Sequence, residues 1–216
     1  MAPAAALFDN DGLTLDTEGA WTLAEQTLFA RYGQTFTMDH KRALLGTAPA
    51  ESAALLETML GQPGPGLSDE LYELAIEQVA KSAEPMPGAV ALLAALAEAG
   101  VPVGLVSNAR RRFVEPALRA AGLEEAFAVV VTADDVPRPK PAPDAYLAAA
   151  AALGVDPAAC AVLEDSPTGL AAGRATGALT IGVPSLPGVV LEADVIAASL
   201  EDGAVWRALG LEARVT

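Results

Sequence analysis

Two aspartates stand two positions apart directly after the first apolar run of the chain. In the segment FDNDGLTLDTE at 8–18, Asp9 and Asp11 precede Gly12, which allows the backbone to turn sharply. Two such carboxylates can divide a reaction between them. One, ionised, attacks an electrophile such as phosphorus and binds a cation, while the other, protonated, gives its proton to a leaving oxygen. Taken alone, the segment is equally typical of an acidic turn after a strand.

Three further segments carry polar residues suited to an anion or a cation. Ser107 and Asn108 follow another apolar run, and their hydroxyl, amide and backbone N–H groups can hold phosphoryl oxygens without adding charge. Lys140 stands just ahead of a predicted helix start, where an anion is favoured. Glu164 and Asp165 follow the apolar run CAVL at 160–163. A pair of carboxylates together with water molecules is a ligand set that suits Mg²⁺.

Buried strands and helices alternate along most of the chain, which is what must bring these side chains together. The strand candidates show no polar face, as in a parallel sheet covered on both sides. They are AAALF at 4–8, VPVGLV at 101–106, AVVV at 128–131, CAVL at 160–163 and LTIGV at 179–183. Helical patterns at 88–99, 111–121 and 143–153 each end at a glycine. We therefore predict an α/β fold with a doubly wound, five-stranded parallel sheet, whose strand ends share one edge.

The alternation breaks after the first strand, where the sequence becomes helical for about seventy residues. We predict a helical cap over 17–84, inserted into a catalytic core made of 1–16 and 85–216. The last cap helix is expected to begin at Ser68, after a bend formed by GQPGPG at 61–66.

Composition narrows the chemistry. A formal charge of −15 disfavours nucleic acid and anionic membranes as partners, and no apolar run is long enough to cross a bilayer. A cytoplasmic location is expected, since the start of the chain carries no secretory signal pattern. The single cysteine, Cys160, and the single histidine, His40, leave little for zinc or for histidine-based catalysis. Carboxylates are left to carry a reaction.

The four polar segments carry Asp9 and Asp11, then Ser107 and Asn108, then Lys140, and last Glu164 and Asp165. In this order along the chain they resemble the motifs of the haloacid dehalogenase-like superfamily, in the subgroup with a helical cap after the first strand. The resemblance covers the whole chain and implies a Mg²⁺-dependent phosphatase for a small phosphorylated metabolite. It implies that Asp9 is the nucleophile and Asp11 the general acid and base. Ser107, Asn108 and Lys140 would bind the phosphoryl group.

The same resemblance implies a metal site and a sheet order. Asp9, Asp11 and Asp165 would belong to the metal site, with Glu164 binding directly or through water. Counting only the five core strands, the order would be fifth, fourth, first, second, third, which makes the strands before Asp9 and Asp165 neighbours.

Alternative functions lie both within and outside the superfamily. A dehalogenase or phosphonatase is disfavoured because those members lack an acid at the position of Asp11. A phosphoacceptor signalling or binding protein is the alternative from a different class, but signalling domains of that kind are much shorter and lack the cap.

The closer rival is a hexose-phosphate mutase of the β-phosphoglucomutase type. Its cap loop resembles LLGTAPAES at 44–52, a predicted specificity loop that includes Gly46 and Thr47. Leu45 and Pro49 stand where the mutase pattern has basic residues, and Trp21 replaces a histidine. The remaining cap bases are Arg31, Lys41, Arg42 and Lys81. We expect Lys41 and Arg42, the two nearest the loop, to face solvent, which favours a phosphatase.

Overall fold

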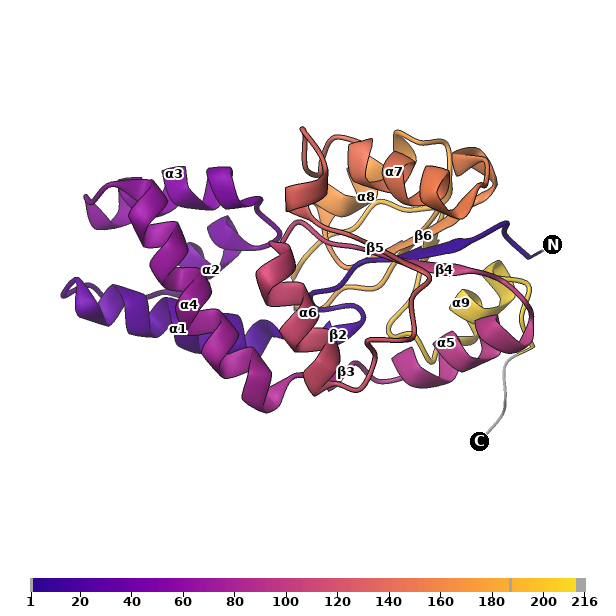
Figure 1. Ribbon diagram of the computed structural model, residues 1–216, viewed down its shortest axis with the longest axis horizontal. Coiled ribbons are helices and arrows are strands. Elements are labelled where there is room, and N and C mark those ends of the chain that lie inside the picture. The colour runs from indigo at the N-terminus through magenta and orange to yellow at the C-terminus, as the bar shows by residue number, and fades with distance from the viewer. Residues whose placement is uncertain (1, 187, 213–216) are drawn as a thin grey trace.

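A computed structural model describes residues 2–186 and 188–212 as an α/β core with a group of helices beyond one end of its sheet (Figure 1). All strands of the core sheet pair in parallel, in the order β5-β4-β1-β6-β7-β8. Their bounds are β1 Ala6–Phe8, β4 Val103–Val106, β5 Val129–Val131, β6 Ala161–Glu164, β7 Leu179–Gly182 and β8 Val195–Ile196. The predicted order of the five core strands is confirmed.

The strand count differs from the prediction by one. β8, with only two residues, extends the sheet beyond β7, and its pairing of Ile181 with Val195 is parallel like the rest. A two-residue strand is too short to show a hydrophobic period, so the sequence pattern did not reveal it.

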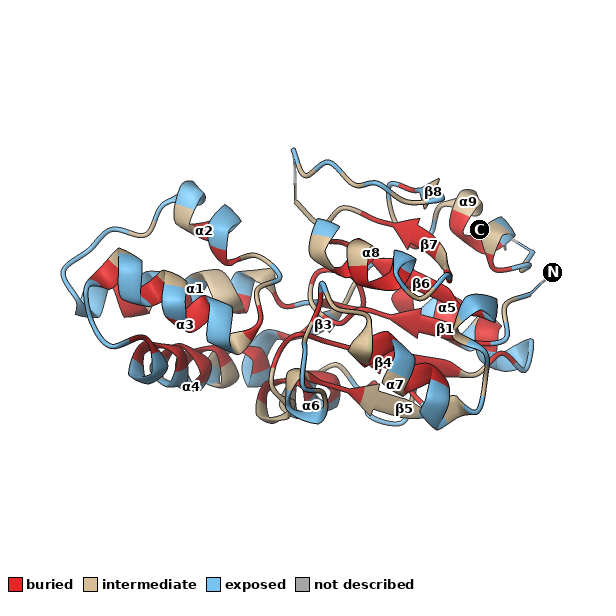
Figure 2. Ribbon diagram, turned by 90° about the horizontal axis from the view of Figure 1, so that it is seen from above, coloured by how far each residue is buried: buried red, intermediate tan, exposed pale blue. Residues whose placement is uncertain are grey.

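Helices cover both faces of the sheet because its strands are apolar on both sides. Leu7 packs with α7 and α8 on one face, whereas Ala6 and Phe8 pack with α5, α6 and α9 on the other. β1, β4 and β6 are buried along their whole length, as Figure 2 shows. The helix bounds are α5 Ala89–Glu98, α6 Arg111–Ala120, α7 Asp144–Leu153, α8 Pro167–Arg174 and α9 Gly203–Ala208. Two short 3₁₀ turns lie at Ala133–Asp135 and Pro157–Ala159.

The remaining helices lie together beyond the carboxyl ends of the strands (Figure 1). They are α1 Glu18–Arg31, α2 Met38–Leu44, α3 Pro49–Leu60 and α4 Gly64–Ser82. A short antiparallel pair, β2 Leu15–Asp16 and β3 Glu84–Pro85, joins the outgoing chain to the returning one. We propose that the cap boundaries at 16/17 and 84/85 fall within this pair.

The predicted start of the last cap helix is wrong by one turn. α4 begins at Gly64, not at Ser68, so only the first part of GQPGPG is a loop. Pro65 fits in the first turn because the N–H that it lacks has no helical partner there. A side chain at Gly64 would meet the carbonyl of Ala53, so the glycine lets α4 approach α3 closely. Ser68 lies inside the helix and is buried.

Candidate active site

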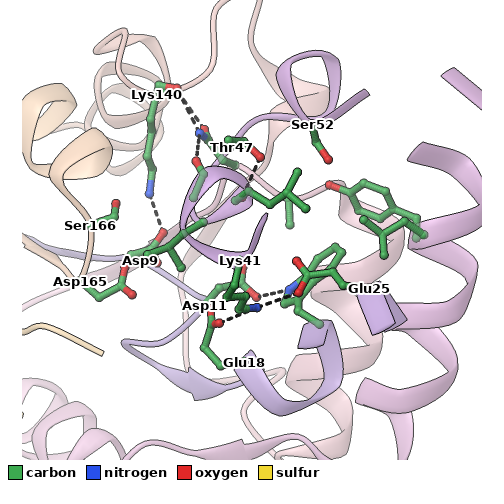
Figure 3. A pocket seen from close by; sticks show the side chains of 18 residues that line it. Asp9, Asp11, Glu18, Glu25, Lys41, Thr47, Ser52, Lys140, Asp165 and Ser166 are labelled. Atoms are coloured by element: carbon green, nitrogen blue, oxygen red, sulfur yellow. Dashed lines mark hydrogen bonds and ion pairs between the residues drawn. The ribbon is translucent and has the colours of Figure 1, made fainter. Parts of the chain in front are cut away.

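Four loops that follow strands of the sheet deliver the predicted polar residues to one edge. Figure 3 shows Asp9, Asp11, Lys140 and Asp165 around the pocket at this edge. Asp9 follows β1, and Asp165 follows β6, which is the neighbouring strand. Ser107 and Asn108 follow β4, and Lys140 lies between β5 and α7. Residues distant in sequence therefore meet because parallel strands all end on this side.

Lys140 is the centre of a buried charge cluster. Its Nζ lies 2.6 Å from Asp9 Oδ1 and 2.5 Å from Glu164 Oε1, and it donates to the carbonyl of Val106 at 2.8 Å. Tyr146 donates its hydroxyl to the same oxygen of Glu164 at 2.6 Å. Burial alone would lower the pKa of Lys140, but Asp9 and Glu164 raise it, so the ammonium stays charged.

Asp9, Glu164 and Asp165 together can hold a cation. Each offers a carboxylate oxygen, and these oxygens lie within 4.8 Å of one another. Burial raises the pKa of Asp9 well above its ordinary value and that of Asp165 to about 8, and Glu164 raises both further. When all three carboxylates are ionised, Lys140 offsets only one of their three negative charges. The two that remain match a divalent ion, and hard carboxylate oxygens are what Mg²⁺ prefers.

Two glycines make room for this acid cluster. Gly12 has φ +78°, and a Cβ there would lie 2.5 Å from Asp165 Oδ2, so its loop can pass Asp165 only without a side chain. At Gly169, in α8, a Cβ would overlap the carboxylate of Glu164. At the start of α8, the Ser166 hydroxyl accepts a hydrogen bond from the N–H of Gly169.

Asp11 points away from that acid cluster and toward the cap. Its Oδ1 accepts from Thr17 Oγ1 at 2.6 Å and from Trp21 Nε1 at 3.1 Å, and its Oδ2 accepts from Ser107 Oγ at 3.3 Å. Four residues were predicted to ligate the metal. The structure brings the carboxylates of Asp9, Glu164 and Asp165 together, whereas the carboxylate of Asp11 is not part of this cluster. Its role at the metal remains a prediction.

Asn108 ties the predicted specificity loop to the core. Its Nδ2 donates to the carbonyls of Gly46 and Lys140, each at 3.1 Å, and its Oδ1 accepts from the backbone N–H of Lys140 at 2.9 Å. Gly46 and Thr47 line the same cavity as Asp9 and Lys140, which has a volume of about 80 Å³. The cavity therefore lies between core and cap.

The expectation that Lys41 faces solvent is wrong. Lys41 is 5% exposed and lines the cavity, with its Nζ 2.9 Å from Glu18 Oε2 and 3.1 Å from Glu25 Oε2 (Figure 3). Glu18 and Glu25 lie seven residues apart on α1 and so share the face that meets α2. Arg42 is exposed as expected, paired with Asp39.

Burial and charge act against each other in this cap cluster, by which we mean Lys41, Glu18 and Glu25. Burial raises the pKa of Glu25 to about 7, and Lys41 works in the opposite direction. Burial would lower the pKa of Lys41, but the two carboxylates raise it. The sequence patterns did not identify Glu18 and Glu25 as candidate site residues. Their seven-residue spacing on a predicted helix was the signal available.

Comparison with known proteins places the chain in a family. The family model described as haloacid dehalogenase-like hydrolase matches residues 3–177. The chain belongs to the haloacid dehalogenase-like hydrolase family. The expected superfamily is confirmed, and the parallel sheet with its carboxylates at the strand ends is the architecture expected for it.

Relatives and solved structures of this hydrolase family are similar over most of the chain. Putative phosphatase YhcW of Bacillus subtilis is 37% identical over 84% of this chain and 83% of that protein. Hexitol phosphatase B of Escherichia coli K12 is 33% identical over 84% of this chain and 83% of that protein. The bifunctional riboflavin kinase/FMN phosphatase of Arabidopsis thaliana is 36% identical over 84% of this chain. The match spans only 48% of that longer protein.

Among solved structures, CbbY from Rhodobacter sphaeroides in complex with phosphate superposes with a TM-score of 0.81 at 26% identity, covering 92% of this chain and 95% of that one. A variant of CbbY was solved in complex with xylulose-(1,5)bisphosphate, at a TM-score of 0.80, 25% identity and the same coverage. Among the residues described here, no helix is both long and apolar enough to cross a membrane.

Proposed function

We propose that this hydrolase is a Mg²⁺-dependent phosphatase that cleaves a small phosphorylated metabolite through an aspartyl-phosphate on Asp9. The observation that carries the proposal is the contact of Asp9 Oδ1 with Lys140 Nζ at 2.6 Å, inside a cavity that also exposes Asp11 and Asp165. The names of the Bacillus and Escherichia relatives, both phosphatases, support the reaction class.

In the first half of the reaction, a carboxylate oxygen of Asp9 attacks phosphorus and the ester P–O bond breaks. Asp11, oriented by Thr17 and Trp21, gives its proton to the departing oxygen. Lys140 is fixed by three acceptors and presents its charge to the transferring phosphoryl group without having to reorganise.

In the second half, water attacks the aspartyl-phosphate and Asp11 takes the proton that the water loses. Inorganic phosphate leaves and Asp9 is restored as a carboxylate. Mg²⁺ held by Asp9, Asp165 and Glu164 would offset charge on the phosphoryl oxygens. Ser107 and Asn108 are proposed to help hold that group, and Gly46 and Thr47 to contact the rest of the substrate. Nucleic acid and membranes are not expected partners, and we retain the cytoplasmic expectation.

A phosphate-release screen with and without Mg²⁺ tests the proposal. Sugar phosphates, polyol phosphates, phosphoglycolate, nucleotides and phenyl phosphate form the panel, and a chelator gives the metal-free arm. We expect steady turnover of at least one ester with Mg²⁺ and none in the chelator. A single stoichiometric phosphorylation without phosphate release would instead favour the phosphoacceptor alternative.

A trapping experiment tests the intermediate separately. Rapid acid quenching during turnover of a labelled ester should leave acid-stable, hydroxylamine-sensitive label on the protein, which is the behaviour of an acyl phosphate. The Asp9→Asn variant should carry none. The label accumulates when hydrolysis of the aspartyl-phosphate is the slow step. Under that condition, turnover without any trapped label would contradict covalent catalysis by Asp9.

A further inference from the structure

The cap cluster of Lys41, Glu18 and Glu25 faces the phosphoryl site across one cavity (Figure 3). Lys41 comes from α2, and both carboxylates come from α1. The walls of the same cavity also include the apolar residues Leu44 and Leu71. A substrate whose phosphate lies beside Asp9 and Lys140 would therefore turn its other end toward the cap cluster.

A structural role alone is a poor account of this cluster. Three ionisable groups that are removed from water lose solvation that their mutual attraction only partly restores, and apolar residues of similar size would serve packing as well. Lys41 and Glu25 are 5% and 4% exposed, yet both reach the cavity wall. Both side chains therefore border the space that a substrate would fill.

The charges of the cluster decide what kind of group it can bind. A second phosphate needs net positive charge, but carboxylate oxygens of Glu18 and Glu25 lie 2.9 and 3.1 Å from the Lys41 ammonium, the cation of this cluster. Even if Glu25 holds a proton, Glu18 still offsets Lys41. The cluster combines N–H donors with carboxylate acceptors, which is the pairing that hydroxyl groups satisfy, since each hydroxyl both donates and accepts.

We propose that Lys41, Glu18 and Glu25 bind the hydroxyl groups of a sugar or polyol monophosphate and exclude a second phosphate. The proposal rests on the phosphatase function above and names its substrate class. It also bears on the mutase alternative: Lys41 does turn inward, but its charge is already compensated, so it does not replace the basic residues missing at Leu45 and Pro49.

The first experiment uses the unmodified protein, so folding of a variant does not enter. We compare kcat/KM for sorbitol 6-phosphate, 1-hexyl phosphate, phenyl phosphate and glucose 1,6-bisphosphate with Mg²⁺ present. Sorbitol 6-phosphate should exceed both the equally long hexyl ester and the bisphosphate by at least about tenfold, the size of one well-formed hydrogen bond to a charged group. Equal values for sorbitol and hexyl esters, or a preference for the bisphosphate, would overturn the proposal.

The second experiment moves the preference with variants. Lys41→Met should lower kcat/KM for sorbitol 6-phosphate at least about tenfold and leave phenyl phosphate within about threefold, because only the distal contact is lost. The double variant Glu18→Gln with Glu25→Gln frees the ammonium and should raise activity toward the bisphosphate while lowering it toward the monophosphate. Arg42→Met, an exposed neighbour on α2, is the control and should change neither. Equal losses on every ester would overturn the assignment.

These outcomes separate the two levels of the argument. No phosphate release from any ester, phenyl phosphate included, would defeat the proposed function. Release from phenyl phosphate with no gain from hydroxyl groups would defeat only the role of the cap cluster and leave the phosphatase in place.

Discussion

Trp21 donates its indole N–H to Oδ1 of Asp11 across 3.1 Å, so a helix of the cap orients a carboxylate of the core. The ring itself is held by Tyr72 and Phe113, with centroids at 5.3 and 4.5 Å. In the mutase pattern, the position of Trp21 is occupied by a histidine, and that difference alone suggests no role for the tryptophan. The structure makes it a candidate positioning residue for Asp11.

Trp21→Phe tests that role because phenylalanine keeps an aromatic ring and removes the donor. We expect kcat to fall about tenfold, which corresponds to about 1.4 kcal/mol for one hydrogen bond to a charged group, with a smaller change in KM. Trp206→Phe is the matched control, since Trp206 lies in α9, its indole donates to the carbonyl of Leu200, and neither residue lines the cavity. Equal losses of kcat in the two variants would show a general effect on folding.

Asp9→Asn should abolish turnover and leave the fold intact. The amide keeps the shape of the side chain but removes the nucleophile and one ligand oxygen. Phosphate release is the measurement, with circular dichroism and thermal unfolding as the checks on folding. Activity above about a hundredth of wild type, a barrier change under roughly 2.7 kcal/mol, would count against covalent catalysis.

Asp11→Asn should depend on the leaving group. If Asp11 protonates the departing oxygen, alkyl phosphates should lose far more kcat than p-nitrophenyl phosphate, whose leaving group needs no proton. The ratio of the two losses is the measurement. Equal losses would mean that Asp11, with its contacts to Thr17 and Trp21, chiefly orders the segment between core and cap.

Most of the core and its acidic edge could be predicted because buried parallel strands leave a local mark. Each of the five apolar runs overlaps an observed strand, and the placement of Asp9 and Asp165 followed from where two of those runs end. β8 is too short to leave such a mark. The prediction that Lys41 faces solvent failed for a different reason. The direction of this side chain depends on how α2 packs against α1, and no pattern within α2 encodes the position of Glu25.

Asp165→Ala should weaken Mg²⁺ binding. Two carboxylates and Lys140 would remain near the site, so the Mg²⁺ concentration for half-maximal activity should rise by at least about tenfold. Calorimetric titration of Mg²⁺ gives the same comparison without turnover. Asp39→Ala, at a carboxylate that is 92% exposed on the cap, is the control. An unchanged Mg²⁺ requirement in Asp165→Ala would remove this residue from the metal site.

The stability of the protein should carry a pH signature of Glu25. Its pKa is about 7 in the folded chain and close to 4.5 when unfolded, since burial outweighs the attraction of Lys41. Between those values the folded state holds a proton that the unfolded state has released, so the free energy of unfolding must fall as pH rises from about 5 to 8. Two to three pKa units correspond to about 3 kcal/mol.

Glu25→Gln removes this proton without removing much volume, so the variant isolates the effect. Urea unfolding of both proteins at pH 5, 6, 7 and 8 gives the difference in unfolding free energy at each pH, and contributions from all other groups cancel. Wild type should lose about 2 to 3 kcal/mol relative to Glu25→Gln across that range. A flat difference would mean that Lys41 and the open cavity keep Glu25 ionised throughout, and a difference that grows in favour of wild type would mean that the ion pair outweighs burial.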